Sequence, residues 1–424
     1  MHSIIPQTLI FALLTIGACL PQKADFEREM GQALPFDEDV LNDKVLGLLV
    51  GTAIGDAMGA PTEMWPRTEI NAKYGWVDRL DTMVREVSPE GIWVADLPAG
   101  GTTDDTRWKK LTVEYLHNEP GHELSAKRFA RHILTQYQSY LDERKTIGQE
   151  DSLALEENFL RVGWLQEWAK VSGPYVQNDY VNYLNSLSTF YGGEMVCAGL
   201  LYSPAIGGLF PGQAEKAYSE AFKLAIFDLG YARDISALAA AMTAAAMKPG
   251  ATPEDVIAVI RTIDPYHYGD ARLVGRTAQR ILGIAESIVA NARTESRQID
   301  GESSKKQVVT RDEMQVAFVL LDEHLQDMPF HAGEIFLQVI TAMLLSDFDF
   351  ELTLQFLVNY GRDNDTTAAI AGAILGAYWG IAQLPETMYQ QVLNVSKKQL
   401  DLDILDLAKI YTQKVQSIHS RPSG

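Results

Sequence analysis

A glycine occurs at every fourth position in Gly47-Leu-Leu-Val-Gly-Thr-Ala-Ile-Gly-Asp-Ala-Met-Gly59, and the same spacing returns at Gly372, Gly376 and Gly380. Residues four apart lie on one face of a helix. Because a glycine inside a helix costs up to about 1 kcal/mol relative to alanine, this repeated use needs a structural reason. Close approach of another helix, where a side chain would not fit, is that reason. We expect both helices to be central, and each is a candidate neighbour of the other.

Apolar residues recur at helical spacing along most of the chain, whereas the alternating patterns typical of strands are scarce. The best strand candidate is the short stretch Gly91-Ile-Trp-Val-Ala, and the polar, aperiodic residues 294–307 predict a solvated loop. The pattern predicts one large all-α domain over residues 43–424, with few or no strands. Its helices are expected over residues 43–59, 105–118, 123–141, 214–228, 231–247, 253–263, 272–292, 311–325, 332–345, 351–360, 366–382 and 401–416.

The composition is that of an acidic globular protein. The 424 residues are 46% hydrophobic, and 36 Lys and Arg against 56 Asp and Glu give a formal net charge of −20. Such a chain can bury a large core, but it lacks the basic face that binding nucleic acid by bulk electrostatics requires. Two cysteines, Cys19 and Cys197, cannot make a disulfide framework. We expect Cys197 to be a small core hydrophobe.

The N-terminus has the features of an export signal. An apolar run from Thr8 to Leu20 is too short to span a membrane, and it ends in Leu14-Thr-Ile-Gly-Ala-Cys19. This ending resembles the lipobox of a bacterial lipoprotein, in which the cysteine becomes the lipidated first residue. The alternative is an ordinary secretory signal with a chance cysteine. We therefore expect residues 1–18 to be a signal peptide and 19–42 a tether. The mature protein is expected in the periplasm or at the cell surface, contacting the membrane only through a lipidated Cys19, or secreted.

Two acidic turns precede predicted helices. Gly101-Thr-Thr-Asp-Asp-Thr106 lies before the helix at 105–118, and Gly361-Arg-Asp-Asn-Asp-Thr-Thr367 before the helix at 366–382. One interpretation is helix capping, because Asp and Thr accept from the first N–H groups of a helix. A cap needs one carboxylate, however, and each turn has two. Four carboxylates brought together would raise one another's pKa unless cations neutralised them. Hard divalent cations bound through oxygen supply that charge.

A third acidic segment, Gly55-Asp-Ala-Met-Gly-Ala-Pro-Thr-Glu63, ends the first glycine helix. Asp56 is either a buried cap or ion-pair partner, or part of the site. Glu63 is either a solvated turn residue or an acid that faces the metal pocket and handles a proton.

Taken in order, these motifs resemble the ADP-ribosylglycohydrolase family, which includes the dinitrogenase-reductase-activating glycohydrolases and is similar to the J-type crystallins. The resemblance covers about residues 43–385 and implies an all-α orthogonal helical domain. It also implies two divalent cations, Mg²⁺ or Mn²⁺, and cleavage of the glycosidic bond of ADP-ribose through a metal-activated water. Glu63 would be the catalytic acid beside the anomeric carbon, and Asp56 would orient the site. The implied metal ligands are Thr103, Asp104, Asp105, Asp363, Asp365 and Thr366.

The sequence departs from the family pattern at two places that bear on the substrate. The second metal turn contains a cationic residue, Arg362. Its side chain either contacts a phosphate or points to solvent. The loop that embraces ADP-ribose in relatives matches Tyr191-Gly192-Gly193-Glu194-Met195-Val196-Cys197, with Val196 in place of an arginine. The candidate substrate-binding residues are therefore Asp56, Gly192, Gly193, Glu194, Met195 and Arg362. Tyr191 and Trp65 are either core aromatics or residues that stack on a base.

Three functions are compatible with these motifs. The first is a metal-dependent glycohydrolase acting on ADP-ribose or a related ribosyl or glycosyl conjugate. The second is a non-catalytic relative that binds a nucleotide or sugar, because fold alone does not imply activity. The third is a metal-dependent phosphoester hydrolase. The ligand positions and Glu63 are all acidic or hydroxylic, which favours the enzyme.

Overall fold

The computed structural model describes residues 38–85, 94–300 and 309–419. The predicted signal peptide, Cys19 and the tether up to residue 37 lie outside the described residues. The rest of the predicted tether, residues 38–42, forms the first turns of a helix. Within the described ranges the structure is helical apart from one small antiparallel pair of strands, in which Met83 lies opposite Leu97. The all-α fold is therefore confirmed.

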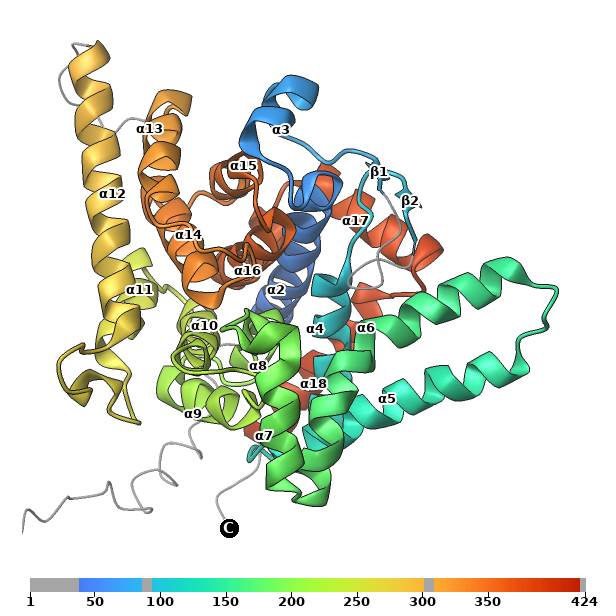
Figure 1. Cartoon of the computed structure of the whole chain (residues 1–424). Coiled ribbons are helices and arrows are strands. Elements are labelled where there is room, and N and C mark those ends of the chain that lie inside the picture. Colours follow the sequence, from blue (N-terminus) through green and yellow to red (C-terminus); the bar gives the residue numbers. More distant parts are fainter. Residues whose placement is uncertain (1–37, 86–93, 301–308, 420–424) are drawn as a thin grey trace, which may run out of the picture.

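The elements follow one another along the chain as separate helices with short connections (Figure 1). Their bounds are α2 (Glu38–Gly59), η1 (Ala60–Thr62), α3 (Arg67–Tyr74), β1 (Met83–Val84), β2 (Asp96–Leu97), α4 (Asp104–Asn118), α5 (Ala126–Thr146), α6 (Ser152–Gln177), α7 (Tyr180–Thr189), η2 (Phe190–Gly193), η3 (Ala198–Leu201), α8 (Ser203–Gly207), α9 (Ala214–Leu224), α10 (Ala232–Ala246), α11 (Pro253–Thr262), η4 (Tyr268–Asp270), α12 (Thr277–Asp300), α13 (Arg311–Asp322), α14 (Ala332–Leu345), α15 (Phe350–Tyr360), α16 (Asn364–Trp379), η5 (Ile381–Gln383), α17 (Glu386–Gln399) and α18 (Ile404–His419).

The predicted helices all occur, with ends that shift by a few residues. The loop predicted from residue 294 is wrong up to Asp300, because α12 continues to that residue. Arg, Glu and Gln are good helix formers, so polarity alone does not end a helix. The helices α3, α6, α7 and α17 were not expected. In α6, Gly163, Gly173 and Pro174 interrupt the helical pattern. Most of the predicted strand at 91–95 lies outside the described residues, and β2 begins one residue beyond it.

The two glycine helices lie side by side at the centre of the molecule (Figure 1). A side chain at Gly51 would overlap the carbonyl oxygen of Gly372, and a side chain at Gly372 would overlap that of Gly51. The same reciprocal contact joins Gly47 and Gly376. The backbones of α2 and α16 therefore touch along antiparallel glycine faces, which confirms that the two helices are neighbours.

The central helix α2 is apolar and long. The segment Glu38–Thr62 could cross a membrane by length and composition, but 94% of its apolar window is buried inside the protein. It is therefore the core helix of a globular fold. Its one buried cation, Lys44, donates to the carbonyl oxygens of Ala377 at 2.9 Å, Tyr378 at 3.0 Å and Ala246 at 3.1 Å. Lys44 thus ties the C-terminal ends of α16 and α10 to α2.

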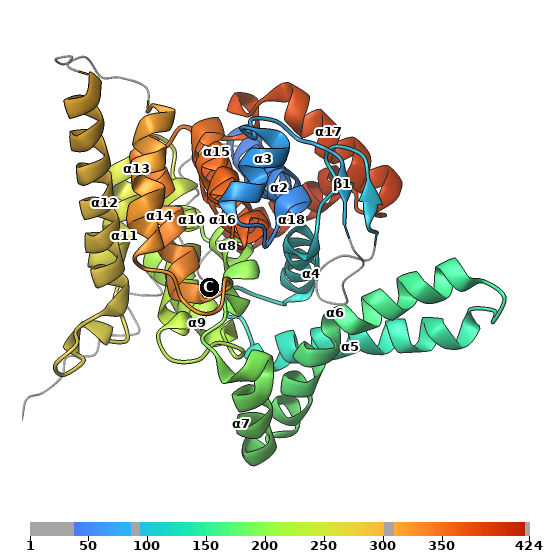
Figure 2. The ribbon, with the colours of Figure 1, turned by 45° about the horizontal axis from the view of Figure 1, so that its top comes forward.

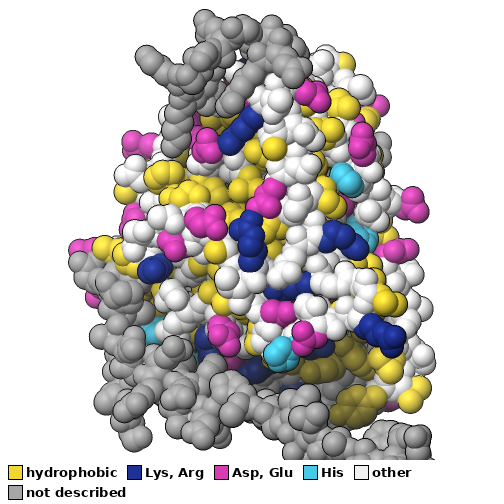
Figure 3. All heavy atoms as spheres, turned by 90° about the vertical axis from the view of Figure 1, so that its left-hand side faces the viewer, with side chains coloured by type: hydrophobic (Ala, Val, Ile, Leu, Met, Phe, Trp, Pro, Cys, Tyr) yellow, Lys and Arg dark blue, Asp and Glu magenta, His cyan; other side chains and the backbone are white. Residues whose placement is uncertain are grey.

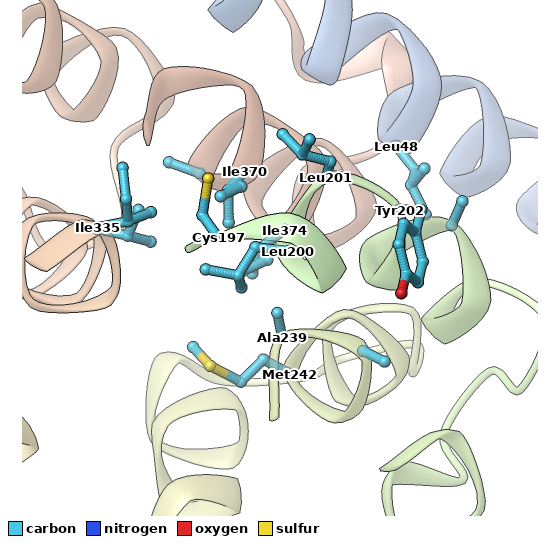
Figure 4. Close-up of a cluster of buried hydrophobic side chains, with 14 of the residues drawn as sticks. Leu48, Cys197, Leu200, Leu201, Tyr202, Ala239, Met242, Ile335, Ile370 and Ile374 are labelled. Carbon is cyan, nitrogen blue, oxygen red and sulfur yellow. The ribbon is translucent and has the colours of Figure 1, made fainter. Parts of the chain in front are cut away.

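The main core surrounds this pair and reaches the middle of the chain. Figure 4 shows Leu48 of α2 and Ile370 of α16 with side chains from η3, α10 and α14. Small residues such as Ala239 allow α10 to approach the centre, and all these residues are buried. The core therefore holds η3, which follows the predicted substrate loop, against the helix that carries one acidic turn.

Two parts of the fold lie further out. The helices α5 and α6 form an antiparallel hairpin that projects from the body (Figures 1 and 2). On another side, α12 and α13 form a face on which acidic and basic side chains are interspersed with apolar ones (Figure 3). That mixed face is unlike the single-sign basic stripe of a nucleic-acid-binding surface.

We expect Gly51→Ala to lower the free energy of unfolding by at least about 3 kcal/mol, because the added methyl group meets backbone that cannot move aside. The matched control is Gly283→Ala in the exposed part of α12, where nothing lies within 4 Å of the added atom. That change should raise the free energy by up to about 1 kcal/mol. Thermal or urea unfolding of both variants measures the difference. Equal stabilities would contradict the close contact.

Candidate active site

The end of α2 and the start of α16 are joined by backbone hydrogen bonds. The amide of Met64 donates to the carbonyl of Arg362 at 2.7 Å, and the amide of Arg362 donates to the carbonyl of Trp65 at 3.3 Å. Gly361 has a φ of +89° and leaves no room for a side chain beside Trp65. This pairing brings Glu63, directly after η1, next to Asp363, directly before α16.

Asp56 holds the other acidic turn in place from within α2. The carboxylate is fully buried, and Oδ1 accepts hydrogen bonds from the Thr103 amide at 2.8 Å and from its hydroxyl at 3.0 Å. Its Oδ2 accepts from the Thr106 amide at 2.9 Å and from its hydroxyl at 2.5 Å. Asp56 therefore caps α4 from a neighbouring helix. These contacts match the orienting role that the resemblance implied. Asp56, which was also a candidate substrate-binding residue, is not among the residues that line the cavity described below.

The two acidic turns contact each other directly. The Thr103 hydroxyl shares its one proton between Asp56 and Oδ2 of Asp365, which lies 3.1 Å away, and the Thr366 hydroxyl donates to Oδ2 of Asp105 at 3.0 Å. Each turn thus supplies one hydroxyl to a carboxylate of the other. Residues about 260 positions apart in the sequence meet at one place, as the charge pattern predicted.

These turns line a pocket of about 580 Å³, a volume that includes the solvent at its open side. Its lining is partly acidic and partly aromatic and apolar. The carboxylates of Glu63, Asp363 and Asp365 each offer an oxygen, and these three atoms lie within 4.8 Å of one another. The acidic and hydroxyl-bearing lining residues are Glu63, Asp104, Asp363, Asp365 and Thr366, and the rest of the lining includes Trp168, Tyr191, Val196, Cys197, Leu201 and Phe330.

Burial and mutual repulsion disfavour ionisation of this cluster. Burial, with the charges of Glu63 and Asp105, raises the pKa of Asp363 to about 8. Burial raises the pKa of Asp105 to about 6, although Lys109 favours its charge. The pKa of Asp365 is raised well above its usual value by burial and by Glu63. Protons or cations must therefore accompany these acids at neutral pH.

The donor set fits divalent cations. Oδ1 of Asp365 is buried and accepts no hydrogen bond from any described residue. Oδ1 of Asp105 is also buried without a hydrogen bond, and Lys109 lies 3.6 Å away. Buried carboxylate oxygens without donors are costly unless a cation binds them. Oxygen ligands of this kind suit Mg²⁺ and Mn²⁺.

Two basic residues compensate the acids from within the protein. The i,i+4 spacing from Asp105 could have indicated Lys109, whereas no motif or spacing marks Arg85. Lys109 is 1% exposed and pairs with Asp105 from one turn further along α4. Arg85 follows β1; its guanidinium contacts the Glu63 carboxylate and donates to the carbonyl of Ala60 at 3.1 Å. Burial opposes the charge of Arg85, but Glu63 and the neighbouring aspartates raise its pKa. Sequence patterns therefore gave no indication that Arg85 lies at the site.

The predicted substrate loop contributes only in part to the cavity. Tyr191, Val196 and Cys197 line it, whereas the intervening residues Gly192, Gly193, Glu194 and Met195 do not. The amide of Cys197 donates to the carbonyl of Phe330 at 2.9 Å, and the ring of Tyr191 lies 5.7 Å from that of Phe330. Cys197 is buried as expected, and burial raises the pKa of its thiol well above the usual value.

Two further candidates lie outside the cavity lining. Arg362 donates from Nε and Nη2 to the carboxylate of Glu334 at 2.7 and 2.8 Å, and to the carbonyl of Gln326 at 2.7 Å. Its guanidinium is therefore engaged by α14 and the segment before it. Trp65 packs against Tyr74, with Lys73 4.9 Å above its ring. Of the two aromatic candidates for stacking, only Tyr191 is placed at the cavity.

Comparisons with known proteins agree with this geometry. The family model described as ADP-ribosylglycohydrolase matches residues 37–419, which include every residue of the acidic site. The chain belongs to the ADP-ribosylglycohydrolase family. Membership supports a glycohydrolase-type hydrolase function, in a family that is typically metal-dependent.

The matches to individual proteins support less than the family model does. A solved structure titled "ADP-ribosylglycohydrolase-related protein complex" is 18% identical, with a TM-score of 0.53 over 90% of this chain and 100% of the other. That likeness shows the shared fold. The uncharacterized protein YegU of Escherichia coli K12 is 53% identical over 38 residues, which is 9% of this chain and 11% of YegU. The match thus spans about a tenth of either protein.

We expect the metal-free protein to lose stability as the pH rises. Asp105 and Asp363 have folded pKa values of about 6 and about 8, above the value of 3.8 expected unfolded. The folded state therefore binds more protons than the unfolded chain. The stability gained from this proton binding is full below pH 3.8 and is lost as the pH rises through the folded pKa values. Melting temperatures in chelator, measured from pH 5 to pH 9, should fall more steeply for the wild type than for Asp363→Asn. If the melting temperatures of the two proteins fell equally with pH, the raised pKa of Asp363 would be refuted.

Proposed function

We propose that this protein is a binuclear metal-dependent glycohydrolase that cleaves the glycosidic bond of ADP-ribose or of a related ribosyl or glycosyl conjugate. The observation that carries the proposal is the direct hydrogen bonding between the two acidic turns at the wall of a cavity. If each acidic turn only capped its own helix, hydrogen bonds between the two turns would not be needed.

The chain's own residues would hold the cations. Asp363 and Asp365 offer oxygens from one side, and Asp104 and Asp105 from the other, while the Thr103 and Thr366 hydroxyls already connect the two. Two divalent cations bound there would supply Lewis acidity that activates a water near the sugar. Asp56 keeps the α4 turn rigid, so the ligand oxygens would be arranged before a cation arrives.

Glu63 is the proposed catalytic acid–base residue. It is half-buried at the cavity wall, within reach of Asp363 and Asp365, and Arg85 contacts its carboxylate. Its place among possible ligand oxygens also allows it to bind a cation. In either role the carboxylate lies where positive charge develops at the anomeric carbon as the acceptor leaves. Arg85 would hold the Glu63 carboxylate in place at the cavity.

The aromatic part of the lining would receive the remainder of the substrate. Tyr191 and Phe330, which both line the cavity, meet edge to face at 5.7 Å and 72°. A flat, apolar group such as a base can pack against such rings. The predicted signal at residues 1–18 would place this activity outside the cytoplasm, on a lipoprotein anchored through Cys19 or on a secreted protein.

We expect Glu63→Gln to lower kcat by about 10²–10⁴-fold, because the amide cannot accept a proton. Asp363→Ala should abolish turnover and also remove the rise in melting temperature caused by Mg²⁺ or Mn²⁺, since that rise requires ions that bind only the folded state. Hydrolysis of ADP-ribosyl and other glycosyl conjugates, followed by product analysis, measures the first effect, and thermal unfolding the second.

The matched control is Asp142→Asn, which removes the charge of an exposed carboxylate on α5. It should leave turnover and the metal-induced shift unchanged. Release of a free sugar hemiacetal would support the glycohydrolase, whereas release of phosphate would support the phosphoester alternative. Full turnover by Asp363→Ala would reject the proposed site, and metal binding without turnover of any conjugate would favour a non-catalytic binding protein.

A further inference from the structure

Two successive residues directly before Asp363 have a backbone conformation that favours glycine. Gly361 has a φ of +89° and Arg362 a φ of +65°. A side chain in this left-handed region costs conformational energy, and such residues persist only where their surroundings hold them in place. The amide of Arg362 donates to the carbonyl of Trp65 at 3.3 Å, and its carbonyl accepts from the amide of Met64 at 2.7 Å. The arginine side chain is therefore expected to serve a purpose that glycine could not.

The side chain of Arg362 anchors the turn to α14, which packs against α16 (Figure 2). Nε donates to Oε1 of Glu334 at 2.7 Å, and Nη2 donates to Oε2 at 2.8 Å. The Glu334 side chain is 3% exposed, and it also accepts from the Gln326 amide at 2.7 Å and from the Gln338 side chain at 2.9 Å. A two-pronged pair with a carboxylate held in this way has one preferred geometry.

The same pair holds the connection from α13 to α14. The amide of Gln326 donates to Glu334, and the carbonyl of Gln326 accepts from Arg362 at 2.7 Å, so the three residues form a closed set of contacts. Four residues later Phe330 lines the cavity, and its carbonyl accepts from the amide of Cys197 at 2.9 Å. Contacts therefore run without a break from the acidic turn before α16 to the aromatic part of the lining.

We propose that the Arg362–Glu334 pair is a positioning device for the active site. It holds the turn before α16 in the shape that Asp363 needs to bind a divalent cation, and it fixes that turn relative to Phe330. Arg362 is not among the residues that line the cavity, so it acts through its neighbours and not on the substrate. The inference rests on the metal site of the proposed function, but not on which bond the protein cleaves.

The sign of the effect distinguishes positioning from electrostatics. Arg362 is a cation next to an acidic ligand, and the charge of Asp363 contributes to raising the pKa of Arg362. By charge alone, removal of Arg362 would relieve repulsion of an incoming cation and strengthen metal binding. Removal of a positioning residue would loosen the ligands and weaken metal binding. Arg362→Gly makes this comparison, because glycine adopts a φ of +65° at no steric cost.

Calorimetric titration of the full chain with Mn²⁺ tests the proposal. We expect Arg362→Gly and Glu334→Gln each to weaken Mn²⁺ binding by about 10–100-fold, the range typical for contacts that orient metal ligands. Glu334→Gln breaks the pair without changing the turn itself. The double variant should bind about as weakly as either single variant, because both substitutions break the same pair. Melting temperatures without metal show that each variant folds.

The matched control is Arg293→Gln, at the opposite end of α14. Arg293 donates to the carbonyls of Leu344 and Leu345, each at 3.1 Å, and to Asp347 at 2.9 Å. Its side chain is 35% exposed, against 24% for Arg362. The control should lower the melting temperature and leave the Mn²⁺ affinity unchanged, which separates positioning from general support of the helix.

Wild-type Mn²⁺ affinity in Arg362→Gly or Glu334→Gln would overturn the proposal, as would tighter binding by Arg362→Gly. Failure of the wild type to bind Mn²⁺ would overturn both this proposal and the proposed function. Weakened Mn²⁺ binding in the variants, with no hydrolysis of any conjugate by the wild type, would refute the proposed function and support the positioning role.

Kinetics on a hydrolysed conjugate test the link to Phe330. Saturating Mn²⁺ should restore the kcat of Arg362→Gly, because the metal site is then filled. KM should remain raised, since the connection that carries Phe330 has lost its contact with the turn. A wild-type KM in this variant would overturn the link between the pair and the aromatic lining.

Discussion

The backbone contact between α2 and α16 is the constraint on which the rest of the structure depends. Reciprocal glycines bring each helix against the carbonyl oxygens of the other, from Gly47 beside Gly376 to Gly59 beside Asp365. At that separation a shift of one or two residues along the axis would place side chains against backbone, so the glycine spacing restricts the register. The antiparallel register aligns the end of α2 with the start of α16. It therefore decides that Glu63 and Asp363 share one wall.

The α2–α16 pair holds several acidic side chains close together at one place. Asp56 forms four hydrogen bonds to the α4 turn, so the fold positions the acids by directed contacts as well as by packing. Lys109 and Arg85 supply positive charge to the cluster, but burial still raises the pKa of Asp363 to about 8. Cations bound among these acids would replace protons.

Much of the site could be predicted because its residues act in short motifs. The meeting of the acidic turns was expected from their charge pattern and the glycine spacing, whereas the role of Asp56 and the place of Glu63 were implied only by the family resemblance. Arg362 shows the limit of this reasoning: its position in a metal turn indicated a substrate contact, whereas Glu334, on α14, engages its guanidinium. Arg85 shows the converse. Its partner Glu63 lies 22 residues away in a different element, and no periodicity connects the two.

The helical class, the central glycine helices and the acidic turns are properties of local sequence, because helix periodicity, capping and like-charge repulsion act over a few residues. Which side chains close the cavity was decided only in three dimensions. Tyr191 and Phe330 come from separate connections that the core holds together. Long-range electrostatics and packing depend on distances between helices, and those distances exist only once α2 and α16 have docked.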